Sequence, residues 1–387
     1  MRIISHIISE LHSVIKDEGV LLFFIFLPIA YPLIYSWIYN NEVVREVPVV
    51  VVDDSHSSAS REFCRMFEAS PDVTIAYRCK NIGEGQRVIA KGDAYGILYF
   101  PADFDKRIGR MEQATVSVYC DMSYMLTYKA IFQTATAISM QMGTEIQRHR
   151  LGNTTVREDE ISTSPLTFDE VPMFNTTAGY GNFILPAVLV LIIQQALLLG
   201  VGMINGTDRE NRFSRYRRGK SDGSSLSFAI TLLVAKTIAY MLIFSVMLAW
   251  ITIVVPHIFG FVSMVHGWDL FRFMMPYLLS CIFLSITASA LIRYRESVML
   301  VVVFSSLILL FMSGVTWPMS SISGVWQGIS QIFPSTFGIR GFVRMNSMGA
   351  RLPEVAAEYH ALWVQTVVYA FAALYVLWRR VRFAEQE

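Results

Sequence analysis

Charged residues are scarce in this sequence, and their scarcity excludes an ordinary soluble protein. Only 16% of the 387 residues are Asp, Glu, Lys or Arg, whereas 53% are hydrophobic. A typical soluble domain carries about 25% charged residues. The basic residues lie beside long apolar runs, a position that membrane topology explains and that does not indicate nucleic-acid binding. The composition therefore predicts a polytopic membrane protein with a substantial polar part.

Motifs for metal and cofactor chemistry are also missing. The four cysteines include no CxxC pair, and the seven histidines are scattered without HExxH spacing. We therefore predict no metal and no cofactor on this chain. Cys64, Cys79 and Cys120 fall in the polar part of the sequence. A disulfide between two of them would fit an oxidising compartment, but their odd number and strand-like surroundings favour buried thiols.

No ATP-binding or catalytic motif is complete. The sequence RRGKS (217–221) contains Gly-Lys-Ser, but a P-loop needs another glycine five residues before Gly219, where Ser214 stands. Asp53 and Asp54 follow a predicted strand without a partner motif, and a strand-to-helix turn capped by Asp explains them. We therefore predict that the chain is not an enzyme.

The distribution of basic residues predicts one membrane topology. Residues 205–220 carry six Lys or Arg between two apolar runs, and such a short basic loop stays cytoplasmic. Both termini are then cytoplasmic, as expected for a multi-pass protein of a bacterial inner membrane. The predicted fold is a polytopic α-helical membrane protein with six transmembrane helices, at 20–39, 183–204, 228–255, 273–292, 297–312 and 361–377.

The polar residues divide the chain into four predicted parts. Residues 1–19 read as a cytoplasmic interfacial helix, although a plain helical start to the first span fits as well. Residues 20–39 form the first span, 40–181 an inserted extracytoplasmic α/β domain, and 182–387 the remaining membrane domain. In the α/β domain, strands are predicted at 47–54, 73–78, 94–101 and 114–121, and helices at 57–70, 81–93, 102–110 and 124–150.

Three polar residues interrupt the predicted spans. Lys236 lies about two turns inside the third span, and its long side chain is expected to snorkel to the cytosolic face. Gln194 and Gln195 lie in the middle of the second span. They are expected to form hydrogen bonds across a helix interface, with a place in a substrate path as the alternative.

Residues 313–350 are apolar but interrupted by Gly and Pro, which predicts re-entrant or periplasmic helical pieces between the last two spans. A Gly that ends a span, a later Pro, and then Pro-Ser-Thr resemble the membrane subunits of ABC-2-type exporters. The RMNSMGA sequence at 344–350 resembles the branch with a large extracytoplasmic domain after the first span. The TDRE sequence at 207–210 resembles the family's acidic-basic-acidic cluster, and the order of one span, an outer domain and five spans is also similar. The segment's matching residues are Gly314, Pro318, Pro334, Ser335 and Thr336.

The resemblance implies a permease that moves a hydrophobic or amphipathic substrate outward, such as a drug, a lipid or an envelope component. A separate cytosolic ABC ATPase would bind the ATP and Mg. A second permease, identical or paralogous, and membrane lipid are the other expected partners, with a periplasmic adaptor as a further candidate. The five residues of the 313–350 segment would form the outer gate. The ATPase-coupling residues would be Asp208, Arg209, Glu210 and Arg212.

Two alternatives stay open at this stage. The coupling residues also fit a solvated loop, and the run of Asn211, Arg212 and Phe213 departs from the Gly-Thr that usually continues the family's cluster. A membrane receptor with an extracytoplasmic ligand-binding domain is the alternative function, although sensors usually carry a cytosolic output domain. The substrate-path residues are not predicted, because no periodicity in the sequence identifies them.

Overall fold

The chain folds into two compact units, one built mainly of apolar helices and one of strands and helices. The helical unit comprises Met1–Glu42 and Pro172–Glu387, and the α/β unit comprises Val43–Val171. The structure, a computed structural model, describes residues 2–40, 43–151, 174–175, 179–210, 224–292 and 294–386. Each unit has its own hydrophobic core.

The α/β unit is organised around a four-stranded sheet in the order β2-β1-β3-β4. The central β1 runs parallel to both neighbours, and β4 runs antiparallel to β3. Four consecutive valines are buried in β1, as a strand covered on both faces requires. The strands are β1 (Val47–Asp53), β2 (Val73–Cys79), β3 (Gly96–Phe100) and β4 (Ser117–Cys120).

Helices cover both faces of this sheet. The side chains of Phe63 on α4 and Ile131 on α7 join one core, and Val88 and Ile89 on α5 pack on the other face. The predicted strands and helices of this unit are confirmed to within a few residues at their ends. The helices are α4 (Ser58–Glu68), α5 (Ile82–Lys91), α6 (Phe104–Gly109) and α7 (Met125–Leu151).

Local hydrogen bonds account for the acidic turn after β1. Asp53 accepts bonds from the backbone N–H groups of Ser55 and His56 and from the hydroxyl of Ser60. The residue that caps α4 is Ser57, so the predicted turn is confirmed but its cap is a serine.

The four cysteines are free, and the structure contains no disulfide among them. Burial raises the pKa of the Cys64 and Cys120 thiols to about 11. These thiols are therefore protonated and unreactive at neutral pH.

The helical unit begins with α1, α2 and α3 and ends with α17. Two stretches of π-helix, Leu22–Phe26 and Trp250–Val254, connect α2 to α3 and α11 to α12. The helices are α1 (Arg2–Lys16), α2 (Glu18–Leu21), α3 (Leu27–Ile38), α9 (Tyr180–Glu210), α11 (Ser225–Ala249), α12 (Val255–Phe259), α13 (Gly267–Ala288), α14 (Ser297–Met312), α15 (Gly324–Ser330), α16 (Pro334–Met348) and α17 (Ala356–Gln386).

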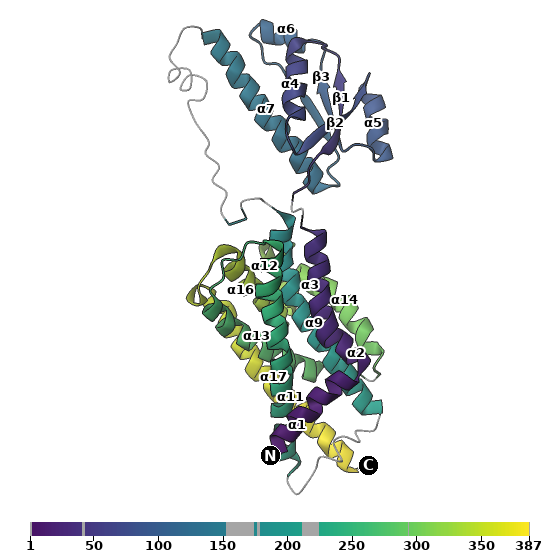
Figure 1. The fold of residues 1–387 in the computed structure, drawn as a ribbon, viewed down its shortest axis with the longest axis vertical. Helices are drawn as coiled ribbons and strands as arrows, with labels where there is room; N and C mark the ends of the chain where they lie inside the picture. Colours follow the sequence, from purple (N-terminus) through teal and green to yellow (C-terminus); the bar gives the residue numbers. More distant parts are fainter. Residues whose placement is uncertain are drawn as a thin grey trace. The chain divides into compact units, whose positions relative to one another are not determined.

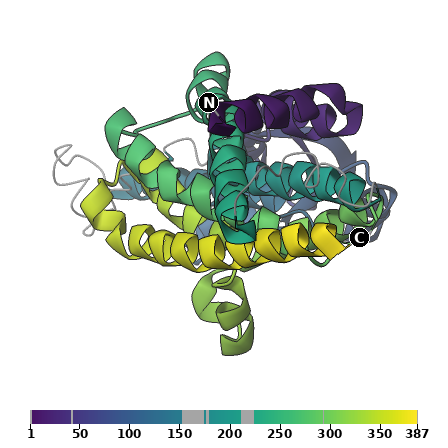
Figure 2. The ribbon, with the colours of Figure 1, turned by 90° about the horizontal axis from the view of Figure 1, so that it is seen from below.

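Helix α9 lies at the centre of this unit. Its side chains are buried along most of its length, and it packs against α13, α14 and α16. Both termini lie at one end of the bundle, which we call the terminal end (Figure 1). Seen from that end, the N-terminal helices lie along one side and α17 along the opposite side (Figure 2).

Among the described residues, five helices are long and apolar enough to cross a membrane: Glu18–Ile38, Tyr180–Glu210, Ser225–Phe259, Gly267–Ala288 and Leu352–Phe383. Most are longer than the predicted spans, because hydropathy marks only the apolar centre of a helix that continues into polar surroundings. The predicted fifth span is α14, with 16 residues. At 1.5 Å per residue it is about 24 Å long, shorter than a hydrocarbon core of about 30 Å. A total of six spans therefore stays a prediction.

Candidate functional site at the terminal end of the bundle

Helix α1 packs on the protein through both polar and apolar side chains. Glu10, Ser13 and Val14 are buried, and the helix packs against α11. Ile4 and Ile8 on its apolar side are exposed in the isolated chain. An amphipathic helix with this arrangement leaves its apolar side available for lipid, as the interfacial interpretation expects.

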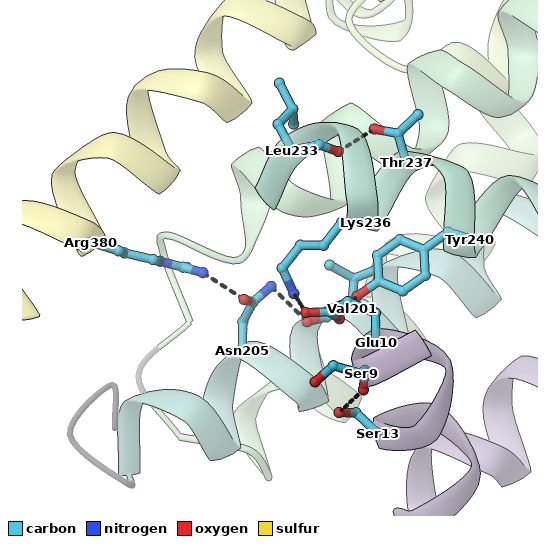
Figure 3. Close-up of polar contacts among 10 residues, drawn as sticks. All are labelled: Ser9, Glu10, Ser13, Val201, Asn205, Leu233, Lys236, Thr237, Tyr240 and Arg380. Carbon is cyan, nitrogen blue, oxygen red and sulfur yellow. Dashed lines mark hydrogen bonds and ion pairs between the residues drawn. The ribbon is translucent and has the colours of Figure 1, made fainter. Parts of the chain in front are cut away.

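A buried ion pair joins α1 to α11. The Nζ of Lys236 lies 2.8 Å from Oε1 of Glu10, and the hydroxyl of Tyr240 donates to Oε2 at 3.2 Å. Lys236 and Tyr240 are four residues apart, so they lie on the same face of α11, and both reach toward Glu10 (Figure 3). Lys236 is only 1% exposed. The expectation that Lys236 snorkels to the surface is therefore wrong, because the Glu10 carboxylate neutralises it inside the protein.

A second contact fixes the end of α1. Arg295, just before α14, donates from Nη1 to Oδ2 of Asp17 at 2.7 Å and from Nη2 to Oδ1 at 2.5 Å. Asp17 also accepts from the backbone N–H groups of Gly19 and Val20 and so caps α2. Burial opposes ionisation of Asp17, but the Arg295 hydrogen bond and these backbone bonds outweigh it and hold the pKa of Asp17 below its ordinary value.

Arg295 also meets the end of α9. Its Nη1 donates to Oγ1 of Thr207 at 3.2 Å, and its backbone N–H donates to Oε1 of Glu210 at 3.2 Å. A Cβ at Gly206 would lie 2.9 Å from the Cα of Arg295, so only glycine allows this close approach. Asp17, Arg295 and the end of α9 therefore form one connected polar cluster.

A third polar contact connects α9 with α17 and the end of α13. Arg380 donates from Nη1 to Oδ1 of Asn205 at 2.6 Å and from Nη2 to Oγ of Ser289 at 3.1 Å. Asn205 in turn donates from Nδ2 to the carbonyl of Val201 at 2.9 Å (Figure 3). The terminal end thus connects segments that are up to 278 residues apart in the sequence.

The predicted coupling residues lie beside this cluster. Asp208 is buried in the last turns of α9, and Arg209 donates to the carbonyl of Ile292 at 3.2 Å. Helix α9 continues through Glu210, so residues 205–210 are helical rather than part of a loop, which corrects the predicted start of the basic loop. Arg212 and residues 211–223 as a whole lie outside the described residues.

A polar cavity of about 970 Å³ opens between α1 and the ends of α9 and α11. Its lining residues carry hydroxyl, imidazole, carboxylate and cationic groups, and they include Ser5, His6, Ser9, His12, Lys16, Asp17, Asp208 and Arg295. Ile204, Phe228 and Leu232 add apolar surface, and a mixed polar and apolar surface is typical of a contact with a protein partner.

The predicted gate residues lie in two places: Pro334, Ser335 and Thr336 begin α16, whereas Gly314 and Pro318 lie between α14 and α15. Gly314 has φ of +87°, a left-handed conformation that favours glycine, and Pro334 is the first residue of α16. The backbone N–H of Ser335 donates to Oε1 of Gln194 at 2.8 Å, and the Thr336 hydroxyl donates to the carbonyl of Ser330. Pro318 precedes the short 3₁₀ helix Met319–Ser321. The predicted cross-helix hydrogen bond is confirmed for Gln194.

Gln195 lines a different, mostly apolar cavity of about 610 Å³ between α3, α9 and α14. Its side chain is 7% exposed, and neither its Nε2 nor its Oε1 has a hydrogen-bond partner among the described residues. Thr316 also lines the cavity, and its hydroxyl likewise has no partner in the described part of the chain. Tyr31 and Tyr35, stacked with ring centroids 4.2 Å apart, form part of one wall. Gln195 therefore lacks the predicted cross-helix bond within the described part of the chain.

Sequence reasoning missed most of these contacts. Glu10 and Asp17 appear as ordinary polar residues of an amphipathic segment, and Arg295 and Arg380 as topology markers. The one available signal is Lys236, because a lone charge deep in an apolar run requires a partner that must come from elsewhere in the chain.

Several apolar helices around buried polar contacts are the architecture of a multi-pass membrane protein. The chain belongs to a family of transporter membrane proteins: the model of the ABC-2 family transporter protein matches residues 19–375. No curated protein matches the chain. Its family assigns it a permease role, and permeases of this family work in general with a partner ATPase.

Proposed function

We propose that this chain is the permease subunit of an exporter in a bacterial inner membrane, with both termini cytoplasmic and the α/β unit outside. A cytosolic ATPase binds the ATP and Mg and drives transport. A second permease, either a copy or a paralogue, completes the transporter, and a periplasmic adaptor is a candidate partner. The cargo is an amphiphile of the drug, lipid or envelope-component class.

The cavity around Gln195 is the observation that supports an amphiphilic cargo. Its walls are largely apolar and are formed by α3, α9 and α14. A buried amide without partners costs about 1–3 kcal/mol, so an unpaired glutamine is expensive in this position. A cargo with an apolar body and a hydroxyl, ester or amide group would fill the cavity and bind Gln195. This arrangement favours the substrate-path interpretation of Gln195.

Photo-cross-linking tests the cargo class. The full chain is reconstituted in nanodiscs with a photoactivatable diacyl phospholipid, and cross-linked residues are located by mass spectrometry. Cross-links are expected on cavity residues such as Leu307 and Phe311. Gln195→Leu should weaken labelling about two- to tenfold, the equivalent of one neutral hydrogen bond.

The matched control is Thr252→Val, which removes a buried hydroxyl that bonds only its own helix and lies outside the cavity. Equal labelling of the Gln195 and Thr252 variants would contradict the proposed cargo site. Labelling by a photoactivatable cationic amphiphile, but not by the phospholipid, would assign a drug-like cargo instead.

The polar cavity at the terminal end is the proposed docking surface for the ATPase. Asp208 lines it, Arg209 and Glu210 follow on α9, and Arg212 is proposed as a further coupling residue. Replacing Arg212, Arg215, Arg217, Arg218 and Lys220 by Gln should abolish co-purification of the ATPase. Arg272→Gln on α13 is the control, because that guanidinium stacks on Trp268. Labelling of a cysteine at position 215 from the periplasm would show an inverted topology and contradict the proposal.

The start of α16 is the proposed outer gate. Gln194 on α9 accepts a hydrogen bond from Ser335, so a movement of α9 would be passed directly to α16. Gly314 lies two residues after the end of α14, and its left-handed conformation allows the chain to turn sharply there. These contacts support a gate that opens when α9 and α16 move together.

A further inference from the structure

The Glu10–Lys236 ion pair constrains the position of α1 on α11 more tightly than attachment alone would require. Two apolar residues of similar size would hold two helices together at least as well, because removing two charges from water costs more than their pairing usually returns. An ion pair adds a geometric requirement instead. A shift of α1 by one turn along α11 would leave two buried charges without partners, whereas an apolar contact would tolerate it.

The other attachment of α1 differs in exposure. The side chains of Lys236 and Glu10 are 2% and 10% exposed, whereas those of Arg295 and Asp17 are 32% and 21% exposed. Water can replace the partners of a partly exposed pair at small cost, but it replaces those of the largely buried pair much less readily, although Glu10 borders the polar cavity. The α1 segment therefore has one fixed attachment, to α11, and one releasable attachment, to the chain before α14.

The two attachments are seven residues apart, or about 10 Å along a helix. They also connect to different neighbours, since Lys236 belongs to α11 and Arg295 precedes α14. A force applied to α1 would therefore move α11 with it and open the contact between Asp17 and Arg295. The polar cavity between α1, α9 and α11 would change shape in the same movement.

We propose that Lys236 is a positioning residue that acts through Glu10 to make α1 and α11 one rigid body, with the Asp17–Arg295 contact as its releasable joint. The proposal rests on the proposed function for the source of the force, which is the ATPase. Tyr240 completes the arrangement by donating to the second oxygen of Glu10, so that both carboxylate oxygens are held from α11.

The test uses pairs of spin labels in the full chain, in nanodiscs, with the native cysteines replaced by serine. One pair, at positions 8 and 242, reports the distance within the proposed body, and a second, at 8 and 299, reports the distance across the joint. The replaced side chains, Ile8, Leu242 and Met299, are all exposed. The variants are Glu10→Met with Lys236→Met, the swap Glu10→Lys with Lys236→Glu, and the control Thr237→Val.

The first arm needs no ATPase. A single sharp distance is expected for positions 8 and 242 in the wild-type chain, the swap and the control, and a broadened distribution in the double methionine variant. The double variant removes both charges and is used because a single replacement leaves one buried charge unpaired and risks misfolding. A distribution as sharp as the wild type in the double variant would overturn the rigid body.

The second arm adds the co-purified ATPase and compares nucleotide-free and ATP-bound states. The distance between 8 and 242 should stay constant while that between 8 and 299 changes. In the double methionine variant, the fraction of molecules whose 8–299 distance changes on ATP binding should fall about fivefold or more. The swap should restore that fraction. A wild-type change between 8 and 242 would overturn the proposal. Failure of the wild-type chain to retain any ATPase would count against the proposed function alone.

Discussion

Lys236 on α11 and Gln195 on α9 are both polar residues buried in apolar helices, but they differ in whether the chain supplies a partner for the polar group. Lys236 has an ion pair with Glu10 and is enclosed. Gln195 has no hydrogen-bond partner in the described part of the chain and lies at the wall of a cavity. The ion pair at the terminal end therefore pairs its polar groups within the chain, whereas the cavity leaves the Gln195 amide and the Thr316 hydroxyl available to a bound molecule.

Neighbouring residues on α9 sharpen this comparison. Gln194 and Gln195 differ by one position, which rotates their side chains by about 100° around the helix. Gln194 consequently faces α13 and α16 and bonds Ser335, whereas Gln195 faces α3 and α14. The same amide group supports the fold at one position and is free for a ligand at the next.

The largest expected effect is that of Lys236→Met. The change leaves the Glu10 carboxylate buried without its cation, which should destabilise the helical unit by about 3–5 kcal/mol. Folded yield and apparent Tm in detergent measure the loss. Adding Glu10→Met should recover most of it, and no recovery would mean that Lys236 contributes mainly by packing.

Gln194→Leu should have an intermediate effect. It removes the acceptor for the buried N–H of Ser335 at the start of α16, at a cost of about 1–3 kcal/mol. Limited proteolysis of the 313–350 segment and the apparent Tm measure the change. A stability equal to that of Gln195→Leu would contradict the different environments of the two glutamines.

Asp17→Asn should have a smaller effect, about 1 kcal/mol or less, because its partner Arg295 is partly exposed. The lowered pKa of Asp17 determines the pH dependence. Its contribution is fully present above the ordinary value of 3.8 and is lost as the pH falls through the lowered pKa. The apparent Tm values of wild type and variant should therefore differ at neutral pH and converge in strong acid. A constant difference across this range would rule out ionised Asp17 as the cause.

Gln195→Leu should change stability least, with an apparent Tm equal to or slightly above that of the wild type. Replacing an unpaired buried amide by an apolar group removes its desolvation cost and breaks no hydrogen bond among the described residues. The comparison with Gln194→Leu in the same detergent is the direct measurement. A marked loss of stability would show that Gln195 has a partner within the folded protein.

Most of the fold is accessible from the sequence, and most of the candidate site is not. The valine run of β1, Ser57 before α4 and Gly92 after α5 are local signals that place their elements correctly. The family can also be recognised from short local motifs, namely Gly314, Pro318 and the Pro-Ser-Thr at 334–336. Glu10 and Lys236, by contrast, are 226 residues apart, and no periodicity links them.

The amino-acid sequence by itself determined that apolar helices would carry this protein, that a strand-rich unit would interrupt them, and which family it belongs to. These properties depend on local propensity, on hydropathy and on short motifs. Only the tertiary structure decided which buried polar groups are paired. That choice depends on which helix faces which. A rotation of one residue around α9 separates Gln194, whose Oε1 is bonded, from Gln195, whose amide has no partner among the described residues.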